Sequence, residues 1–224
     1  MRKKEVSAAI RASGLPEPVK DYFVRAAGGK HGSALKAWLK KDPAGLVKSI
    51  DGLLGAAGEI LGRPKEEVIF ITGFNPNDMA PERFAAALAE LRAVIFLHGE
   101  GFRGLEFIQQ AKAISADIFG LKAARPYVFE VCCLRAEDGL ISAAGVLGAK
   151  YEKKKRQMNS ARKKLAGARG GLFFAADPLG AGAVADKAAL KELALELYEE
   201  KKKPPLTHIC MLSGAIGTVY PPWE

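Results

Sequence analysis

Two acidic side chains near the middle of the chain are spaced so that they could hold one bound group. Residues 127–134 alternate β-branched and aromatic side chains without a breaker, which predicts a strand. Side chains two apart on a strand share a face, so Glu130 and Cys132 should point the same way on a largely apolar surface. A carboxylate in such surroundings needs a partner. A divalent cation such as Mg²⁺, held by Glu130 together with the preceding acid Asp117 and water, is one candidate.

A long basic segment follows these acids. Nine Lys and Arg side chains lie between residues 150 and 169, together with a single acid, Glu152. The apolar side chains here repeat at helix spacing and define one stripe, formed by Leu147, Tyr151, Met158, Ala161 and Leu165. Lys154 falls inside this stripe, and Lys150 and Gln157 fall on one flank of it. Two interpretations stay open: Lys154 extends along the edge of the core to solvent, or Lys150 or Lys154 reaches the acids and supplies a positive charge.

The charge balance indicates what kind of partner the chain binds. The 224 residues include 34 Lys plus Arg against 25 Asp plus Glu, a net charge of +9 and a pI near 9.4. This excess favours acidic partners such as nucleic acid or a phosphorylated ligand. Most of it lies on the predicted helix beside the acids. We therefore expect nucleic acid to contact four basic side chains of this helix, Arg156, Arg162, Lys163 and Lys164.

The order of these features resembles the PD-(D/E)XK nuclease superfamily, over roughly residues 80 to 215. In that family an acid closes one strand, an acid-x-lysine triplet lies on the next strand, and a helix follows whose glutamine and basic residues face the site. Asp117 matches the first acid, Glu130 the second and Gln157 the helix glutamine, and residues 171–177 match the strand that follows. Cys132 departs from the pattern, because it stands where the family has lysine and cannot supply a fixed positive charge.

The resemblance implies a function as well as a fold. It implies an α/β protein with a central mixed sheet flanked by helices, and a hydrolase that cleaves phosphodiesters of DNA or RNA with Mg²⁺, as a metal-dependent endonuclease. Under this reading Asp117 and Glu130 hold the metal. Gln157 orients a ligand or water, and Lys150 or Lys154 steadies the developing charge.

Two other functions stay open. Cys132 favours a non-catalytic nucleic-acid-binding or assembly protein of the same fold. The other alternative is a small-molecule or nucleotide-binding α/β protein that uses a glycine-containing loop after a strand. One such loop would follow a strand at 68–72, and the other, with Gly180 and Gly182, would follow a strand at 172–176.

We expect the chain to divide into two regions. Residues 1–64 form a helical region, and residues 65–224 form the α/β nuclease-like domain. Residues 92–97 fit either the end of a helix that begins at Pro81 or a short strand. That helix carries Glu82 and Glu90, and the resembling nucleases often have a glutamate on the helix before the first acid. Ordinary solvation explains both side chains about as well, so we assign neither to the site.

Several classes of protein are disfavoured by the sequence. No apolar run approaches the ~20 residues of a membrane span, and the first residues lack the apolar core of a signal peptide, so we expect a cytoplasmic protein that does not contact membranes. The three cysteines form no CxxC motif, which fits a reducing compartment, and the three histidines lack metal-ligand spacing. The sequence leaves a homodimer open as an alternative to a monomer.

Overall fold

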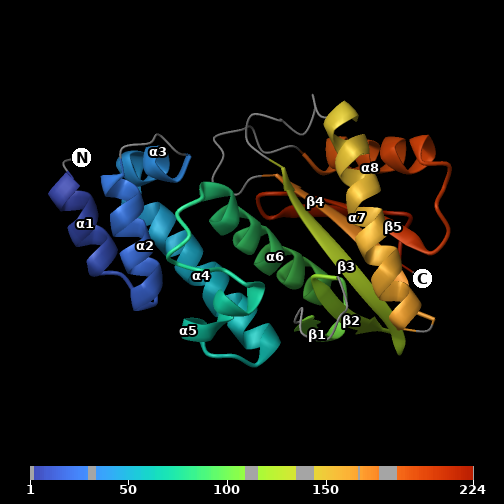
Figure 1. Ribbon diagram of the computed structural model, residues 1–224, viewed down its shortest axis with the longest axis horizontal. Helices are drawn as coiled ribbons and strands as arrows, with labels where there is room; N and C mark the ends of the chain where they lie inside the picture. The colour runs from blue at the N-terminus through green and yellow to red at the C-terminus, as the bar shows by residue number, and fades with distance from the viewer. Residues whose placement is uncertain are drawn as a thin grey trace.

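The computed structural model describes residues 3–29, 34–108, 116–134, 144–165, 167–176 and 186–223. The N-terminal elements are α1 (Lys3–Arg11), α2 (Glu17–Gly28), α3 (Ala34–Lys41), α4 (Pro43–Leu61), α5 (Lys65–Val68) and the 3-10 turn η1 (Phe70–Thr72). The second group is α6 (Pro81–Gly99), β1 (Arg103–Phe107), β2 (Ile118–Lys122), β3 (Arg125–Leu134), α7 (Ala144–Lys164), β4 (Arg169–Ala176), α8 (Lys187–Glu200), β5 (Thr207–Ser213) and β6 (Ile216–Tyr220). Figure 1 shows the N-terminal helices at one end of the molecule and the sheet at the other, with α6 between them.

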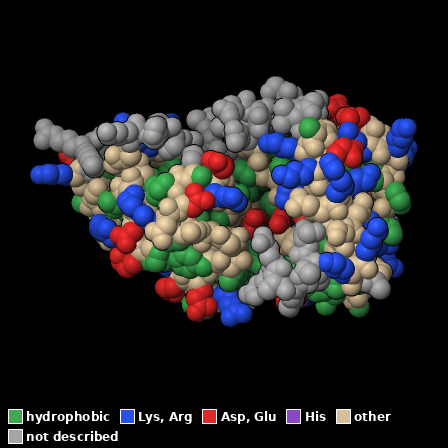
Figure 2. Space-filling view, in the orientation of Figure 1, with side chains coloured by type: hydrophobic (Ala, Val, Ile, Leu, Met, Phe, Trp, Pro, Cys, Tyr) green, Lys and Arg blue, Asp and Glu red, His purple; other side chains and the backbone are tan. Residues whose placement is uncertain are grey.

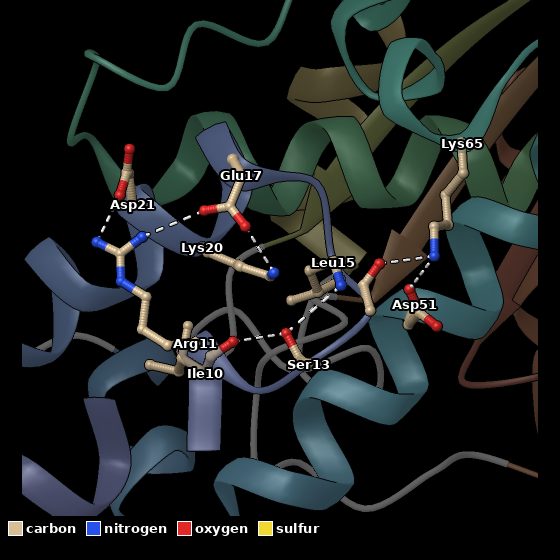
Figure 3. Close-up of polar contacts among 10 residues, drawn as sticks. Ile10, Arg11, Ser13, Leu15, Glu17, Lys20, Asp21, Asp51 and Lys65 are labelled. Carbon is tan, nitrogen blue, oxygen red and sulfur yellow. Dashed lines mark hydrogen bonds and ion pairs between the residues drawn. The ribbon is translucent and has the colours of Figure 1, made fainter. Parts of the chain in front are cut away.

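The N-terminal helices are joined by caps and by polar contacts between neighbouring elements. Asp42 caps α4 by accepting a hydrogen bond from the backbone N–H of Gly45, and the left-handed Gly62 (φ 61°) ends the helix. The Lys65 ammonium lies 2.8 Å from Asp51 Oδ1 and 2.7 Å from the carbonyl oxygen of Gly14, so it ties the start of α5 to α4 and to the turn after α1 (Figure 3). These contacts support the predicted helical region before the sheet.

The strand predicted at residues 68–72 is wrong. This segment forms the end of α5 and the turn η1, with Gly73 left-handed at φ 80°. Val68 and Ile69 are fully buried against the N-terminal helices. A short apolar run has the same pattern whether it is buried in a strand or in a helical turn, which is why periodicity misassigned it. The glycine-loop alternative at this position required a preceding strand, and the structure has a helical segment there instead.

Residues 92–97 belong to α6, so the helical alternative is correct. One helix then precedes three strands, and no βαβ unit spans residues 68–97. Phe84 and Leu88 of α6 pack with the N-terminal helices, whereas Val94 and Leu97 pack under the sheet. The helix α6 therefore contributes to the core of both parts of the chain.

In the described part of the chain, six strands form one mixed sheet in the order β1-β2-β3-β4-β5-β6. Strands β1, β2 and β3 pair antiparallel, β4 runs parallel to β3, β5 runs parallel to β4, and β6 pairs antiparallel with β5. The two parallel steps are joined through α7 and α8. This arrangement confirms the predicted central mixed sheet flanked by helices.

The two faces of the sheet are covered by different helices (Figure 1). Side chains of α7 and α8 form one core with Val128 and Leu134 of β3. Side chains of α6 pack against the opposite face, where Tyr127, Phe129 and Val131 lie. The alternation predicted for β3 is therefore correct, and it places Glu130 on the face covered by α7. None of the helices described is long and apolar enough to cross a membrane.

Candidate functional site

The pairing of β2 with β3 brings the two predicted acids together. Ile118 pairs with Phe129, and the backbone N–H of Asp117 donates to the carbonyl oxygen of Phe129 at 2.9 Å. One further step along this antiparallel register places Asp117 opposite Glu130, and opposed side chains share a face. Asp117 Oδ2 also accepts a hydrogen bond from the backbone N–H of Val131 at 2.7 Å, which fixes its carboxylate against β3.

Lys154 of α7 contacts both acids. Its ammonium lies 2.7 Å from Glu130 Oε2 and 3.4 Å from Asp117 Oδ2. The Glu130 side chain is 0% exposed, and those of Lys154 and Asp117 are 20% and 26% exposed. Of the two interpretations of Lys154, the one in which it reaches the acids therefore describes the structure. A positive charge stands beside the acid pair although Cys132 cannot supply one.

Burial dominates the ionisation of this site. The pKa of Glu130 is raised to about 8; burial is the largest cause, the charge of Asp117 acts in the same direction, and Lys154 opposes both effects. Burial alone would lower the pKa of Lys154, but Asp117 and Glu130 outweigh it and the pKa of Lys154 is raised. Lys154 therefore stays charged near neutral pH. Glu130 Oε1 is buried and accepts no hydrogen bond from the described residues, so it is an oxygen that a ligand could use.

A third acid, Glu90 of α6, lies within electrostatic reach of the same groups and was not assigned to the site from sequence. Burial raises the pKa of this partly buried carboxyl well above its ordinary value, and the charge of Asp117 adds to the effect while Lys154 opposes it. One sequence signal could have found it. Glu90 stands at helix spacing with Val94 and Leu97, which are both fully buried, so it lies on a core-facing side of α6. We call Glu90, Asp117 and Glu130 the acid cluster.

The other predicted site residues lie around this cluster. Burial raises the pKa of the Cys132 thiol, and the charges of Lys150 and Lys154 oppose that shift. Lys150 and Gln157 are partly buried, about one turn before and one turn after Lys154 on α7. Cys132 is thus a largely neutral thiol on the Glu130 side of the sheet, close to α7.

The chemistry of the donors fits a hard divalent cation better than a soft one. Mg²⁺ is commonly held by one or two carboxylates completed by water, and Asp117 with the unpartnered Glu130 Oε1 offers such oxygens. A thiol such as Cys132 is a poor ligand for this ion. Among the residues that the structure describes, no group of three or more His, Cys, Asp or Glu side chains is arranged to hold a metal. The fit therefore rests on the acid pair.

The predicted nucleic-acid-binding side chains do not share one environment. Arg156, Lys163 and Lys164 are exposed on α7. Arg162 is partly buried, and its Nε donates to the carbonyl oxygen of Ala168 at 3.0 Å. Figure 2 shows acidic side chains deep in a hollow at the middle of the visible face, with Lys and Arg side chains beside it over α7 and α8. The predicted glycine loop at 177–182 lies outside the described residues.

Comparison of the chain with protein-family models, with curated proteins and with solved structures finds no match. The fold defines the class: an α/β protein in which an N-terminal helical region precedes a six-stranded mixed sheet packed against α6, α7 and α8.

Proposed function

We propose that this chain is a nucleic-acid-binding hydrolase that cleaves phosphodiesters with Mg²⁺, as a metal-dependent endonuclease of the PD-(D/E)XK type. The observation that carries the proposal is the contact of Lys154 with both Glu130 and Asp117. An acid just before β2, an acid on β3 and a lysine ammonium form the set of charges that this reaction needs, with the lysine supplied by α7 in place of Cys132. The order α6, three antiparallel strands, α7 and β4 supports the proposal at the level of elements.

Each side chain has a role that its surroundings allow. Asp117 and Glu130 would hold the cation, with Glu130 Oε1 as the buried oxygen that lacks another described partner. A bound divalent cation would polarise the phosphate and activate water. The Lys154 ammonium, already fixed beside these carboxylates, would stabilise negative charge that develops on the phosphoryl oxygens. Gln157 would orient water or the ligand from the next turn of α7.

A non-catalytic protein that binds nucleic acid or takes part in an assembly is the second candidate. Cys132 in the position of the motif lysine favours it. So does the lack, in the described part of the chain, of a three-ligand metal group. In that protein Lys154 would serve only to neutralise buried carboxylates, because a buried acid without a partner destabilises a fold. The two candidates share the basic surface of α7 and differ in the reaction.

Nicking and linearisation of a supercoiled plasmid, with a parallel single-stranded substrate, tests the proposed reaction. Wild-type protein should cleave with Mg²⁺ or Mn²⁺ and should stop when the metal is chelated. Asp117→Asn keeps the shape but removes the charge, so cleavage should fall by about 10²-fold or more, the scale of losing one preorganised electrostatic group.

The matched control is Glu196→Gln, which neutralises an exposed acid of α8 and should cleave like the wild type. All proteins should melt at similar temperatures. Wild-type protein that binds nucleic acid and metal but cleaves no substrate would remove the enzyme and leave the non-catalytic candidate.

A further inference from the structure

A basic pocket lies beside α7, on a different flank of this helix from Lys154. Its volume is about 310 Å³. The polar side chains that line it come from α7 and from the end of α8 through the start of β5: Lys155, Asn159, Arg162, Lys201, Lys202 and Thr207. Four of these are cations, and none of the described lining residues is acidic.

The helix geometry separates this pocket from the proposed catalytic site. Lys155, Asn159 and Arg162 stand at positions i, i+4 and i+7, so they form one row along α7. Lys154, which contacts the acids, is offset by about 100° around the helix from Lys155. Lys150 and Gln157 lie farther round in the same direction as Lys154. The pocket and the acid cluster therefore lie beside different flanks of one helix.

The cations of the basic pocket are held in position by neighbouring groups. The ammonium groups of Lys155 and Lys201 lie 5.4 Å and 5.5 Å from the centre of the Tyr151 ring, which is fully buried. Arg162 donates from Nε to Ala168 O and from Nη1 to Asn159 Oδ1. These bonds use two of its five N–H donors, and burial lowers the pKa of Arg162.

Pairing within the protein does not account for all of this charge. Lys201 lies 2.8 Å from Glu200 and 3.9 Å from Glu152, and it also complements the negative end of the α8 dipole. In the described chain, however, no acidic side chain pairs with Lys155, Arg162 or Lys202. Lys155 and Arg162 belong to α7, so the dipole of α8 does not account for their charge.

The turn that ends α8 sets the position of Lys202. Lys202 and the next residue, Lys203, are both left-handed, with φ 58° and 50°. Left-handed residues commonly follow the C-terminus of a helix. Here this turn places Lys202 at the edge of the basic pocket.

The lining chemistry selects the ligand. Clustered cations repel one another, and a bound anion relieves that repulsion. A guanidinium fork with ammonium groups suits phosphate oxygens, and the Asn159 amide and Thr207 hydroxyl add neutral hydrogen-bonding groups. No aromatic side chain is among the described lining residues, so the pocket lacks the ring on which a base would stack.

We infer that the basic pocket binds a backbone phosphate of the nucleic-acid strand, beside a different flank of α7 from the acid cluster. This inference rests on the proposed function and deepens it, because it adds a phosphate site that does not touch the reacting groups. A nucleic-acid strand that is bound at both flanks of α7 would cross this helix. The pocket would then contribute to affinity without reading the base sequence.

The test is the salt dependence of binding to a fluorescein-labelled duplex and single strand, measured by anisotropy for Lys155→Gln/Lys202→Gln. The loss of one phosphate contact should weaken binding about tenfold and reduce the slope of log K against log salt by about 1. Lys187→Gln/Lys191→Gln removes the same charge from exposed positions of α8 and should leave the dissociation constant within about twofold.

The outcomes separate the pocket from the proposed function. Wild-type binding together with an unchanged affinity and slope in Lys155→Gln/Lys202→Gln would overturn the pocket and leave the proposed function standing. No binding by the wild type at low salt would overturn the nucleic-acid function and the pocket with it. If the double variant melts early, Lys202→Gln alone, at an exposed side chain, should still lower the slope, and an unchanged slope would overturn the pocket.

Discussion

Glu130 is a fully buried carboxyl, and its ionisation should make the stability of the fold depend on pH. Its pKa is raised from about 4.5 to about 8 in the folded protein, so folding favours the protonated form. The stabilisation from this group is full below about pH 4.5 and is lost as the pH rises toward about 8. One pKa unit corresponds to about 1.4 kcal/mol, so the effect is on the order of a few kcal/mol.

Glu130→Gln should therefore flatten the fall in melting temperature between weakly acidic and weakly alkaline buffers, measured with a chelator present. Part of the fall should remain, because the pKa of Glu90 is raised in the same direction. The control Glu196→Gln, at an exposed side chain, should keep the wild-type dependence. An equally steep fall in Glu130→Gln and wild type would mean that Glu130 does not carry the shift.

At the scale of residues, local pattern predicted part of the site. Strand alternation was enough to place Glu130 and Cys132 on one face, because successive side chains along any strand point to opposite faces. The contact of Lys154 with the acids was left open, because it depends on how α7 docks on the sheet, and periodicity gives only the side of the helix. Glu90 was missed for the same reason: its helix packs on the opposite face of the sheet, and its approach to the cluster is a tertiary feature.

At the scale of elements, β4 must accept close neighbours on both faces of the sheet. A Cβ atom at Gly170 would lie 2.2 Å from Met158 Sδ, so this glycine lets α7 approach the strand. A Cβ atom at Gly171 would lie 2.5 Å from Phe129 Cδ1. Phe129 is fully buried and packs edge-on against Phe102, so its ring has little room to move.

Gly171→Ala should therefore destabilise the protein by about 1–3 kcal/mol, the usual range for overpacking a core. Gly52→Ala is the matched control, because a Cβ there meets nothing within 4 Å and the position is an exposed turn of α4. It should stabilise by about 0.5–1 kcal/mol through helix propensity. Urea unfolding measures both changes, and a Gly171→Ala protein as stable as wild type would contradict the packing described for β4.

The exposed cations of α7 lead to a prediction about binding. Arg156→Gln, Lys163→Gln and Lys164→Gln combined should weaken nucleic-acid binding and flatten its salt dependence, because fewer counterions are released. Anisotropy titrations over a salt series measure both quantities, with Lys187→Gln/Lys191→Gln as the charge-matched reference. Binding that is indifferent to the three changes would remove these exposed cations of α7 from the interface.

The elements that sequence predicted well were the long or strongly alternating ones. β3 and α7 have extended patterns that fit only one secondary structure. The error at residues 68–72 and the open choice at 92–97 both concern short apolar runs, in which a helix and a buried strand look alike. Both segments are helical in the structure, where Val68 and Ile69 are buried among the N-terminal helices and Val94 and Leu97 are buried against the sheet.

At the scale of the whole molecule, the arrangement of strands and helices unites groups that are far apart in the chain. Glu90 comes from α6, Asp117 immediately precedes β2, Glu130 lies on β3 and Lys154 comes from α7. The mixed sheet flanked by helices was expected from the family resemblance, and the order of elements was predicted only in part, since residues 68–72 were assigned to a strand and residues 92–97 were left open. The neighbour relations of α6 and α7 across the sheet were not predictable, since they depend on packing between distant segments.

If Lys154 supplies the catalytic cation that Cys132 cannot, Lys154→Ala should slow metal-dependent plasmid cleavage by about 10²-fold or more relative to an active wild type. Adding Cys132→Lys to Lys154→Ala should restore part of the rate, because residue 132 shares a face with Glu130. Melting temperatures identify any loss that comes from unfolding. Cleavage at the wild-type rate by a folded Lys154→Ala protein would show that Lys154 does not supply this cation.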